Sequence, residues 1–283
     1  MAAPHCCPGT DLIDTRGATK VVILARGLGT RMRAESSASL RQDQSVAADA
    51  GLKAMIPIDR PFLDYALSGF ADAGLREACL VIGPEHTAVR DYYSRVRPMR
   101  LSIGFAIQER PIGTADAVLA AREFVGDDEF LVVNSDNYYP APVIDELRRA
   151  PAPSLPAFSR EGLLRDGQIP PERIARYALL DIAPDRTLRR IVEKPNEAEA
   201  TALADARVSM NCWHFDARIF EACRRVPQSA RGEHELPLAV QFAIDHLGLS
   251  VNTFAADAPV LDLSQRGDIP SVAARLRDVP VEL

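Results

Sequence analysis

The chain has 283 residues, of which 47% are hydrophobic and 25% are charged, as in an ordinary globular protein. Its net charge of −6 at pH 7 argues against a nucleic-acid partner, because binding a phosphate backbone requires a basic face. The acidic charge does not exclude small phosphorylated ligands, since a local cluster of cations can hold them. No apolar stretch approaches the length of a transmembrane helix, so we expect no membrane partner.

Residues 1–17 are expected to form a disordered tail, and residues 18–283 a single domain. The tail lacks a basic segment followed by an apolar run, so it does not resemble a secretory signal. The cysteines number five, an odd count, and their spacing fits no zinc site. Reduced thiols in a cytoplasmic protein are the simplest interpretation.

Strands alternate with helices between residues 20 and 136. The run 20–25 is β-branched and apolar on both faces, which is typical of a buried parallel strand. A helix is expected over 61–74, with Gly74 as its C-cap. Further strands are predicted over 78–83, 101–108 and 129–136, and helices over 86–96 and 114–125. This alternation predicts an α/β fold with a doubly wound sheet that is mixed but mainly parallel.

The second half of the chain has a less regular pattern. Its prolines predict a surface loop over 150–171, near the functional site. A hairpin is expected over 175–195, turning at Pro184 and Asp185. The remaining predictions are strands over 208–215, 251–256 and 259–263, and helices over 216–226, 234–247 and 269–279.

A glycine-rich loop, RGLGTRMR at 26–33, directly follows the first predicted strand. Glycines there let backbone N–H groups approach phosphate oxygens, and a following helix N-terminus favours an anion. Arg31 and Arg33 add cationic donors. The loop is neither a dinucleotide fingerprint, because Met32 replaces the third glycine, nor a P-loop, because no G-K-[ST] follows. Taken alone, it also fits a tight strand-to-helix turn with solvated arginines.

Two acids, Asp136 and Asp262, each end an apolar run. The carboxyl ends of strands are where α/β sheets bind ligands. Magnesium (Mg²⁺) favours one or two carboxylates plus phosphate oxygens, so both acids could share one ion if their strands end on the same face. Asp136 could instead be an ordinary turn residue.

Two further segments place cations beside apolar runs. Lys53, in GLKAMIPI, could neutralise a triphosphate, or could be a surface lysine. Glu193 and Lys194 follow the predicted strand LRRIV, where they could bind sugar hydroxyls and a phosphate, or simply be two exposed charges.

Together and in order, these segments resemble the sugar-1-phosphate nucleotidylyltransferase (NDP-sugar pyrophosphorylase) family. The resemblance runs from about residue 20 to residue 276. Its segments are LARGLGTRMR, GLKAMIPI, QERPIGTADAV, NSD, EKP, the strand around Asn211 and LDLSQRGDI. It implies a Rossmann-like nucleotidyltransferase fold, with a nucleotide-binding half over 18–145 and a sugar-binding half over 146–283.

The resemblance also implies an activity, the transfer of a nucleoside monophosphate from an NTP to a sugar 1-phosphate. UTP or dTTP is favoured because the QxxPxGTA pattern looks like the uridylyl and thymidylyl members. The implied partners are the NTP and the sugar 1-phosphate, the implied cofactor is Mg²⁺, and a homo-oligomer is left open. The implied site residues are Gly27, Leu28, Gly29, Thr30, Arg31, Gln108, Gly113 and Thr114 for the nucleotide; Glu193, Lys194 and Asn211 for the sugar; Arg31, Lys53 and Lys194 for catalysis; and Asp136 and Asp262 for the metal.

Three features depart from the family pattern. Arg26 stands where the family usually has a small residue or glycine. The segment 35–51 is an insertion between Arg31 and Lys53, which we expect to be polar and mobile. Asn211 replaces a frequent glycine. Arg26 keeps open a second function, a non-catalytic nucleotide-sugar-binding regulatory subunit of the same fold. A Rossmann-type oxidoreductase is disfavoured by the missing third glycine.

Overall fold

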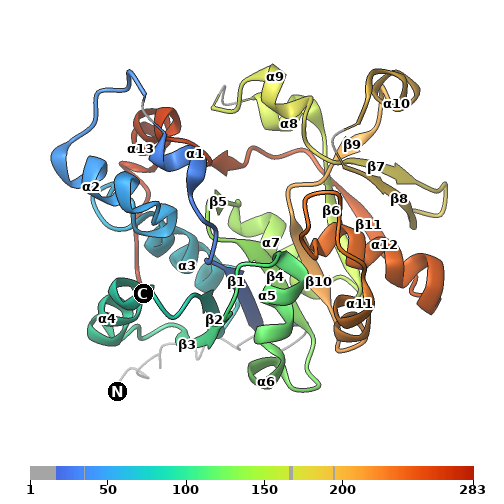
Figure 1. Ribbon diagram of the computed structural model, residues 1–283, viewed down its shortest axis with the longest axis horizontal. Helices are drawn as coiled ribbons and strands as arrows, with labels where there is room; N and C mark the ends of the chain where they lie inside the picture. Colours follow the sequence, from blue (N-terminus) through green and yellow to red (C-terminus); the bar gives the residue numbers. More distant parts are fainter. Residues whose placement is uncertain (1–16, 35, 166–167, 194) are drawn as a thin grey trace, which may run out of the picture.

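The computed structural model describes residues 17–34, 36–165, 168–193 and 195–283, and it is built around one large twisted sheet (Figure 1). Ten strands pair in the order β3-β2-β1-β4-β10-β6-β9-β7-β8, with β11 added on β6, and β12 forms a separate small sheet with β5. The strands are β1 (Lys20–Leu24), β2 (Glu77–Ile82), β3 (Ser102–Ile107), β4 (Phe130–Asn134), β5 (Asn137–Tyr138), β6 (Ser154–Phe158), β7 (Leu179–Ile182), β8 (Leu188–Val192), β9 (Arg207–Val208), β10 (Cys212–Phe215), β11 (Asn252–Ala256) and β12 (Leu261–Asp262).

The sheet is parallel in its N-terminal half and mixed beyond it. β1 pairs in parallel with β2 and β4, so Leu24 lies between Val81 and Asn134. β10 then pairs antiparallel with β4, and β6 in turn pairs in parallel with β11. The predicted mixed, mainly parallel α/β sheet is confirmed.

Helices cover both faces of the sheet because successive strand residues point to opposite sides. In β1, Val21 and Ile23 join one buried cluster and Val22 joins the other. The first cluster is covered by α3, α4 and α7, and the second by α5, α11 and α12. The helices are α1 (Thr30–Arg33), α2 (Gln42–Ala50), α3 (Phe62–Asp72), α4 (Thr87–Val96), α5 (Thr114–Ala120), α6 (Arg122–Val125), α7 (Ala141–Arg149), α8 (Arg160–Leu164), α9 (Pro171–Ile174), α10 (Glu197–Ala202), α11 (Ile219–Arg225), α12 (Leu236–Leu247) and α13 (Ile269–Leu276), with short 3₁₀ turns η1 (Lys53–Met55) and η2 (Arg266–Asp268).

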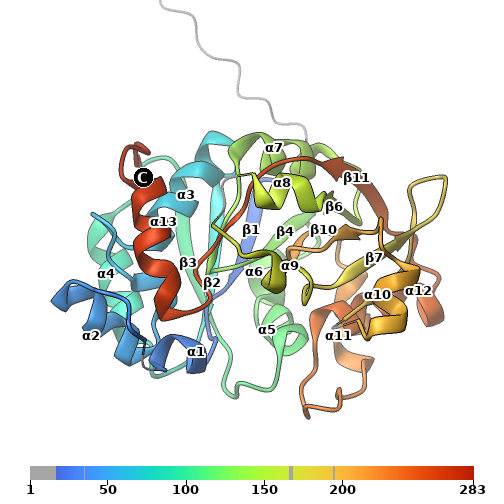
Figure 2. The same cartoon turned by 90° about the horizontal axis from the view of Figure 1, so that it is seen from above.

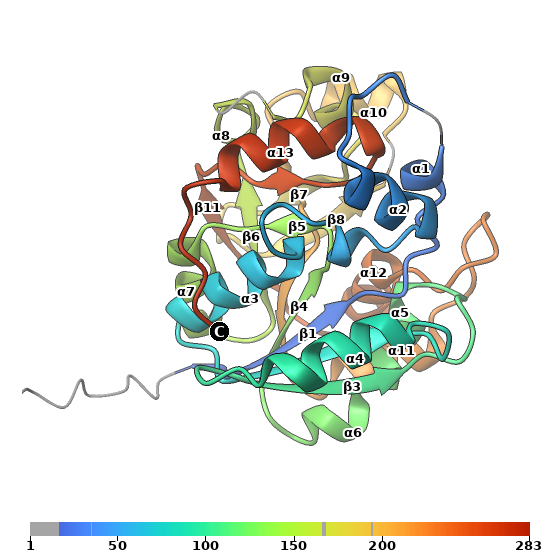
Figure 3. The same ribbon diagram turned by 90° about the vertical axis from the view of Figure 1, so that its left-hand side faces the viewer.

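Within residues 36–51 the insertion after Arg31 contains a helix, which differs from the expectation of a mobile segment. Much of it forms α2, which lies beside α1 and α13 although α13 is at the other end of the chain (Figures 2 and 3). Met32, Ala48 and Leu276 share a third apolar cluster there. Arg266 also donates to the Met32 carbonyl oxygen and pairs with Asp49. The sequence of α2 contains few apolar residues in a helical pattern. The helix is stabilised instead by its tertiary contacts, and for that reason it was not predicted.

The loop predicted over 150–171 is wrong in part, because it contains β6 and α8. Its prolines suggested a break, since proline cannot donate to a sheet. On one side of β6, Ser154 pairs with His214 of β10 and Phe158 pairs with Val208 of β9. Pro156 lies between these two single-residue pairings, so no partner strand on that side requires its N–H. The strand therefore tolerates Pro156 in the interior of the sheet. The helix α7 was not predicted, and the helix expected over 114–125 is split into α5 and α6.

Other predicted elements are found close to their expected positions. The hairpin is formed by β7 and β8, and the side chain of Asp185 accepts from Thr187 in its turn. Cys79, Cys212 and Cys223 are buried free thiols, while Cys6 and Cys7 lie outside the described residues. Within the described ranges, no helix has both the length and the apolarity needed to cross a membrane.

We predict that Leu276→Ala destabilises the protein through the cluster that joins α13 to α1 and α2. Leu276 is fully buried, and truncating such a leucine costs about 2–5 kcal/mol. Urea denaturation followed by circular dichroism measures the loss, with the exposed Arg277→Ala as control. A loss no larger than that of the control would show that α13 does not hold this cluster together.

Candidate active site

A cavity of about 250 Å³ opens at the carboxyl ends of β1 and β4. We call it the central cavity. It gathers segments that lie far apart in the sequence. Residues that line it include Ala25, Arg26, Gly27, Leu28, Lys53, Gln108, Pro111, Gly113, Thr114, Asn134, Ser135, Asp136 and Glu233. The structure thus brings together seven of the predicted site residues, and it adds Arg26 and Glu233 to them.

The glycine-rich loop is held in place by a close backbone contact. Gly29 has φ 62°, and a Cβ atom there would lie 2.4 Å from the carbonyl oxygen of Gly51. Only glycine fits this left-handed position against another backbone. Thr30 then begins α1, and Arg31 is exposed and makes no hydrogen bond or ion pair with the described residues. Arg31 is not among the residues that line the cavity, and its charge is exposed to solvent in α1.

Lys53 and Asp136 form an ion pair on the cavity wall. Lys53 Nζ lies 2.7 Å from Asp136 Oδ2, and the two side chains are 18% and 19% exposed. Lys53 reaches the pair from η1, and Asp136 from the turn after β4. A cation and a carboxylate therefore meet where the resemblance predicted phosphate and metal binding.

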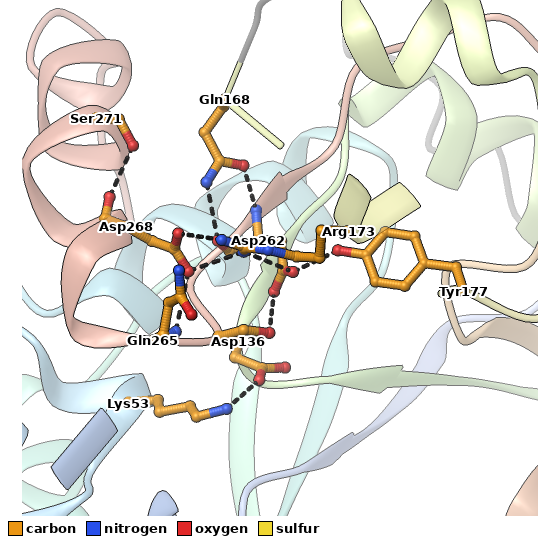
Figure 4. Close-up of polar contacts among 10 residues, drawn as sticks. Lys53, Asp136, Gln168, Arg173, Tyr177, Asp262, Gln265, Asp268 and Ser271 are labelled. Atoms are coloured by element: carbon orange, nitrogen blue, oxygen red, sulfur yellow. Dashed lines mark hydrogen bonds and ion pairs between the residues drawn. The ribbon is translucent and has the colours of Figure 1, made fainter. Parts of the chain in front are cut away.

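Asp262 lies next to Asp136 because β12 pairs with β5 (Figure 4). The Leu263 amide donates to the Asp136 carbonyl oxygen at 2.8 Å, which fixes the two segments together. The Asp262 side chain is 4% exposed. Burial raises its pKa, and the neighbouring charge of Asp136 raises it further. The two predicted metal ligands are thus adjacent carboxylates that repel each other.

Several residues that the sequence did not single out surround Asp262. Ser264 donates to Oδ1 at 2.6 Å, and Tyr177 donates to Oδ2 at 2.5 Å. Arg173 donates to Oδ2 at 3.3 Å and forms a two-point pair with Asp268 (Figure 4). Burial, together with the charge of Asp262, raises the pKa of Tyr177, so its hydroxyl stays a donor.

The main chain of Asp262 is held as firmly as its side chain. The Gln168 amide donates to the Asp262 carbonyl oxygen and accepts from its N–H. Gln168 belongs to the proline-rich segment that was interpreted as a loop, and Arg173 follows directly after it in α9. Nothing in their spacing signals a role near an acid.

Gln108 follows β3 and is almost fully buried. Its amide nitrogen donates to the Gly113 carbonyl oxygen and to Asp116 Oδ2, each at 2.9 Å. Its carbonyl oxygen Oε1 accepts no hydrogen bond within the described part of the chain, so it is an available acceptor on the wall of the cavity.

The turn after Gln108 is fixed by Gly113 and Thr114. Gly113 has φ 124°, and a Cβ atom there would lie 2.3 Å from the His234 carbonyl oxygen. Thr114 accepts from the Leu236 amide at 2.7 Å through its hydroxyl oxygen. The turn and the segment before α12 therefore hold each other in place.

The predicted sugar-binding residues are not gathered in this cavity. Glu193 follows β8. The hydrogen bond from Arg231 to Glu235 raises the pKa of Arg231, and the charge of Glu193 adds to this effect. Asn211 has φ 53°, a left-handed conformation that glycine and asparagine adopt most readily, which explains why it can replace glycine. Lys194 lies outside the described residues.

The chain belongs to the nucleotidyl transferase family, whose sequence model matches residues 20–258. Several of its relatives are named for an activity on glucose 1-phosphate. A glucose-1-phosphate thymidylyltransferase of Streptomyces antibioticus is 28% identical over 235 residues, which are 80% of this chain and 58% of the relative. The UTP–glucose-1-phosphate uridylyltransferase AglF of Haloferax volcanii is 24% identical, covering 92% of this chain and 97% of the relative.

Solved structures show the same fold. A UDP-glucose pyrophosphorylase complexed with UDP-glucose superposes with a TM-score of 0.71 at 16% identity, covering 93% of this chain and 99% of that one. The enzyme from Acinetobacter baumannii gives 0.70 at 18% identity, with 93% and 95% covered. The predicted family and fold are confirmed. The chain spans under two thirds of the length of several relatives, including 57% of a glucose-1-phosphate thymidylyltransferase of Streptomyces griseus.

We predict that Arg173→Met destabilises the protein by about 3 kcal/mol or more, since it leaves Asp262 and Asp268 buried without their cation. Urea denaturation at pH 7 measures the change. The exposed Arg176→Met is the matched control. Equal stabilities of the two variants would mean that the arginine does not compensate the buried acids.

Proposed function

We propose that this protein transfers a nucleoside monophosphate from an NTP to a sugar 1-phosphate, giving an NDP-sugar and pyrophosphate. The central cavity carries the proposal, because it places the glycine-rich loop and the Lys53–Asp136 pair in one space with Gln108. One side offers cations and a carboxylate for phosphates, and the other offers an acceptor for a base. The names of the relatives support the same activity.

The reaction needs positioning more than acid–base chemistry. A phosphate oxygen of the sugar 1-phosphate attacks the α-phosphorus and forms the new P–O bond. The bond from that phosphorus to the bridging oxygen breaks, and pyrophosphate leaves with the electron pair. The nucleophile is already an anion at neutral pH, so no general base is required. Lys53 would hold the reacting phosphate, and Arg31 would stabilise charge on the pyrophosphate.

Asp136 and Asp262 fit a magnesium ion. Among the described residues no group of three or more His, Cys, Asp or Glu side chains could hold a metal, but Mg²⁺ needs only one or two carboxylates when phosphates complete its shell. The two carboxylates are adjacent because β12 pairs with β5, and a cation between them would offset their mutual repulsion. When bound, the ion would neutralise charge on the phosphates.

The orientation of Gln108 supports UTP or dTTP as the nucleotide. Its N–H groups are used by Gly113 and Asp116, so only Oε1 is left for a base. An acceptor pairs with the imide N–H of uracil or thymine, whereas cytosine and adenine present an acceptor nitrogen at that place. Thr114 and the backbone of Gly113 would complete the base pocket.

The sugar side of the site rests on the resemblance. We propose that Glu193 and Asn211 bind the sugar and that Lys194 holds its phosphate. From the sequence we also propose a cytoplasmic location and a homo-oligomer.

We predict that Asp136→Asn lowers turnover by at least about 100-fold while leaving the fold intact, since it removes one charge from a site that holds cations against phosphates. Pyrophosphate release from a panel of NTPs and sugar 1-phosphates measures this, with circular dichroism as the check on folding. The exposed Asp278→Asn is the control. Activity of Asp136→Asn close to that of the wild type would disprove the metal assignment.

The same panel separates the enzyme from the regulatory subunit. A regulatory subunit would bind an NDP-sugar and release no pyrophosphate with any pair of substrates. Release that depends on magnesium would exclude that function.

We predict that Gln108→Ala lowers kcat/KM for UTP by about 10- to 100-fold, the effect of losing one well-buried hydrogen bond to the substrate. The loss for CTP is expected to be smaller, so the preference for UTP narrows. Steady-state kinetics measures both, with the exposed Gln228→Ala as control. Equal losses for the two nucleotides would argue against a base-reading role.

A further inference from the structure

Arg26 is the residue of the glycine-rich loop that the proposed reaction does not use. It follows β1 and lines the central cavity. Its side chain is only 8% exposed, although it is a long cation in a loop at the edge of a cavity. A small residue would leave this space open, so the presence of Arg26 changes what the cavity can bind.

The guanidinium of Arg26 is only partly satisfied. Nη2 donates to both carboxylate oxygens of Glu85 at 3.4 Å. Nε and Nη1 are buried and have no hydrogen-bond partner among the described residues. A buried donor without a partner destabilises the folded state, so native proteins seldom leave one unless something else supplies the acceptor. Arg26 as a residue lines the central cavity, so a ligand bound there would be able to supply that acceptor.

The position of Arg26 shows which part of a nucleotide it would meet. Its partner Glu85 follows β2, and Nε is close enough to Gly83 that a Cβ atom there would lie 2.5 Å away. The guanidinium therefore lies over the end of β2. In the sheet order β3-β2-β1-β4, that is the side of Gln108, which follows β3, and the opposite side from Asp136, which follows β4.

Charge favours a neutral acceptor. Glu85 already faces the guanidinium, so the pair as a whole carries no net charge. For the phosphates the proposed reaction already has other cations, Lys53, which pairs with Asp136 after β4, and Arg31 in α1. A carbonyl oxygen of the base is the acceptor that fits both the place and the charge.

We propose that Arg26 is a specificity-determining residue that donates from Nε or Nη1 to a carbonyl oxygen of the pyrimidine base. Uracil and thymine carry such an oxygen, O2 or O4, on each side of the imide N–H that Gln108 Oε1 would accept. Gln108 and Arg26 would then together recognise the imide N–H of the base and the carbonyl oxygen beside it. This inference rests on the proposed function, because it requires an NTP in the central cavity.

Binding of UTP, 2-thio-UTP and 4-thio-UTP, measured by calorimetry with magnesium, tests the proposal. Sulfur is a weak acceptor, so we expect one thio analogue to bind the wild type about tenfold more weakly than UTP, the size of one lost hydrogen bond to a charged donor. Arg26→Met keeps the apolar stem and removes the donors, so the affinity for UTP should fall by a similar factor in this variant. The penalty for the thio analogue should disappear in that variant.

Two further variants sharpen the test. Arg26→Lys keeps the charge but loses the fixed N–H geometry, so it should behave like Arg26→Met. Arg95→Met removes an exposed cation on α4 and should change nothing. If the Arg26 variants fail to fold, the wild-type comparison of the two thio analogues with UTP still decides whether a base carbonyl is read.

Several outcomes would overturn the proposal. One is an equal affinity of the wild type for UTP and both thio analogues. Another is a thio penalty that persists in Arg26→Met. The third is a loss of tripolyphosphate binding in Arg26→Met as large as the loss for UTP, which would place the guanidinium on the phosphates. A wild type that binds no NTP would remove the proposed function together with this inference, whereas UTP binding insensitive to Arg26 removes the inference alone.

Discussion

The pairing of β12 with β5 is the constraint on which the rest of the site depends. It sets Asp262 beside Asp136, two carboxylates from positions far apart in the chain. Placing like charges together away from water costs free energy, and the surrounding groups offset that cost. Lys53 pairs with one acid, while Arg173, Tyr177 and Ser264 donate to the other. The local positive charge is therefore arranged around an acidic pair in a chain that is acidic overall.

The same arrangement divides the cavity into two chemically different ends. The β4 side holds ionic groups, which suits phosphates and a metal. The side of β2 and β3 holds oriented hydrogen-bonding groups, with Gln108 fixed by Asp116 and Arg26 fixed by Glu85. In both cases a carboxylate outside the reacting centre orients the group that would meet the ligand. Recognition and chemistry would thus be separated by the glycine-rich loop between them.

Much of the fold could be predicted because its signals are local. The alternation of buried strands with helices between residues 20 and 136 follows from apolar periodicity. The ordered motifs pointed to Lys53 and to the strand ends that carry Gln108 and Asp136. What was missed depends on tertiary contacts. α2 has almost no apolar face, and β6 contains a proline whose missing N–H matters only if a partner strand needs it. Arg173 and Tyr177 could not be placed beside Asp262 without the sheet that brings them there.

The contacts of Arg266 and Gly51 have a consequence for how this protein can vary. Arg266 follows Asp262 closely in the sequence and reaches both Met32 and Asp49, while Gly51, at the end of the insertion, touches Gly29. The inserted helix α2 therefore connects the glycine-rich loop with the segment that carries Asp262. A shorter connection could not be grafted in by itself, because Arg266 and the apolar side of α13 would lose their counterparts. The insertion and the C-terminal helix therefore depend on each other for packing, although most of the chain lies between them.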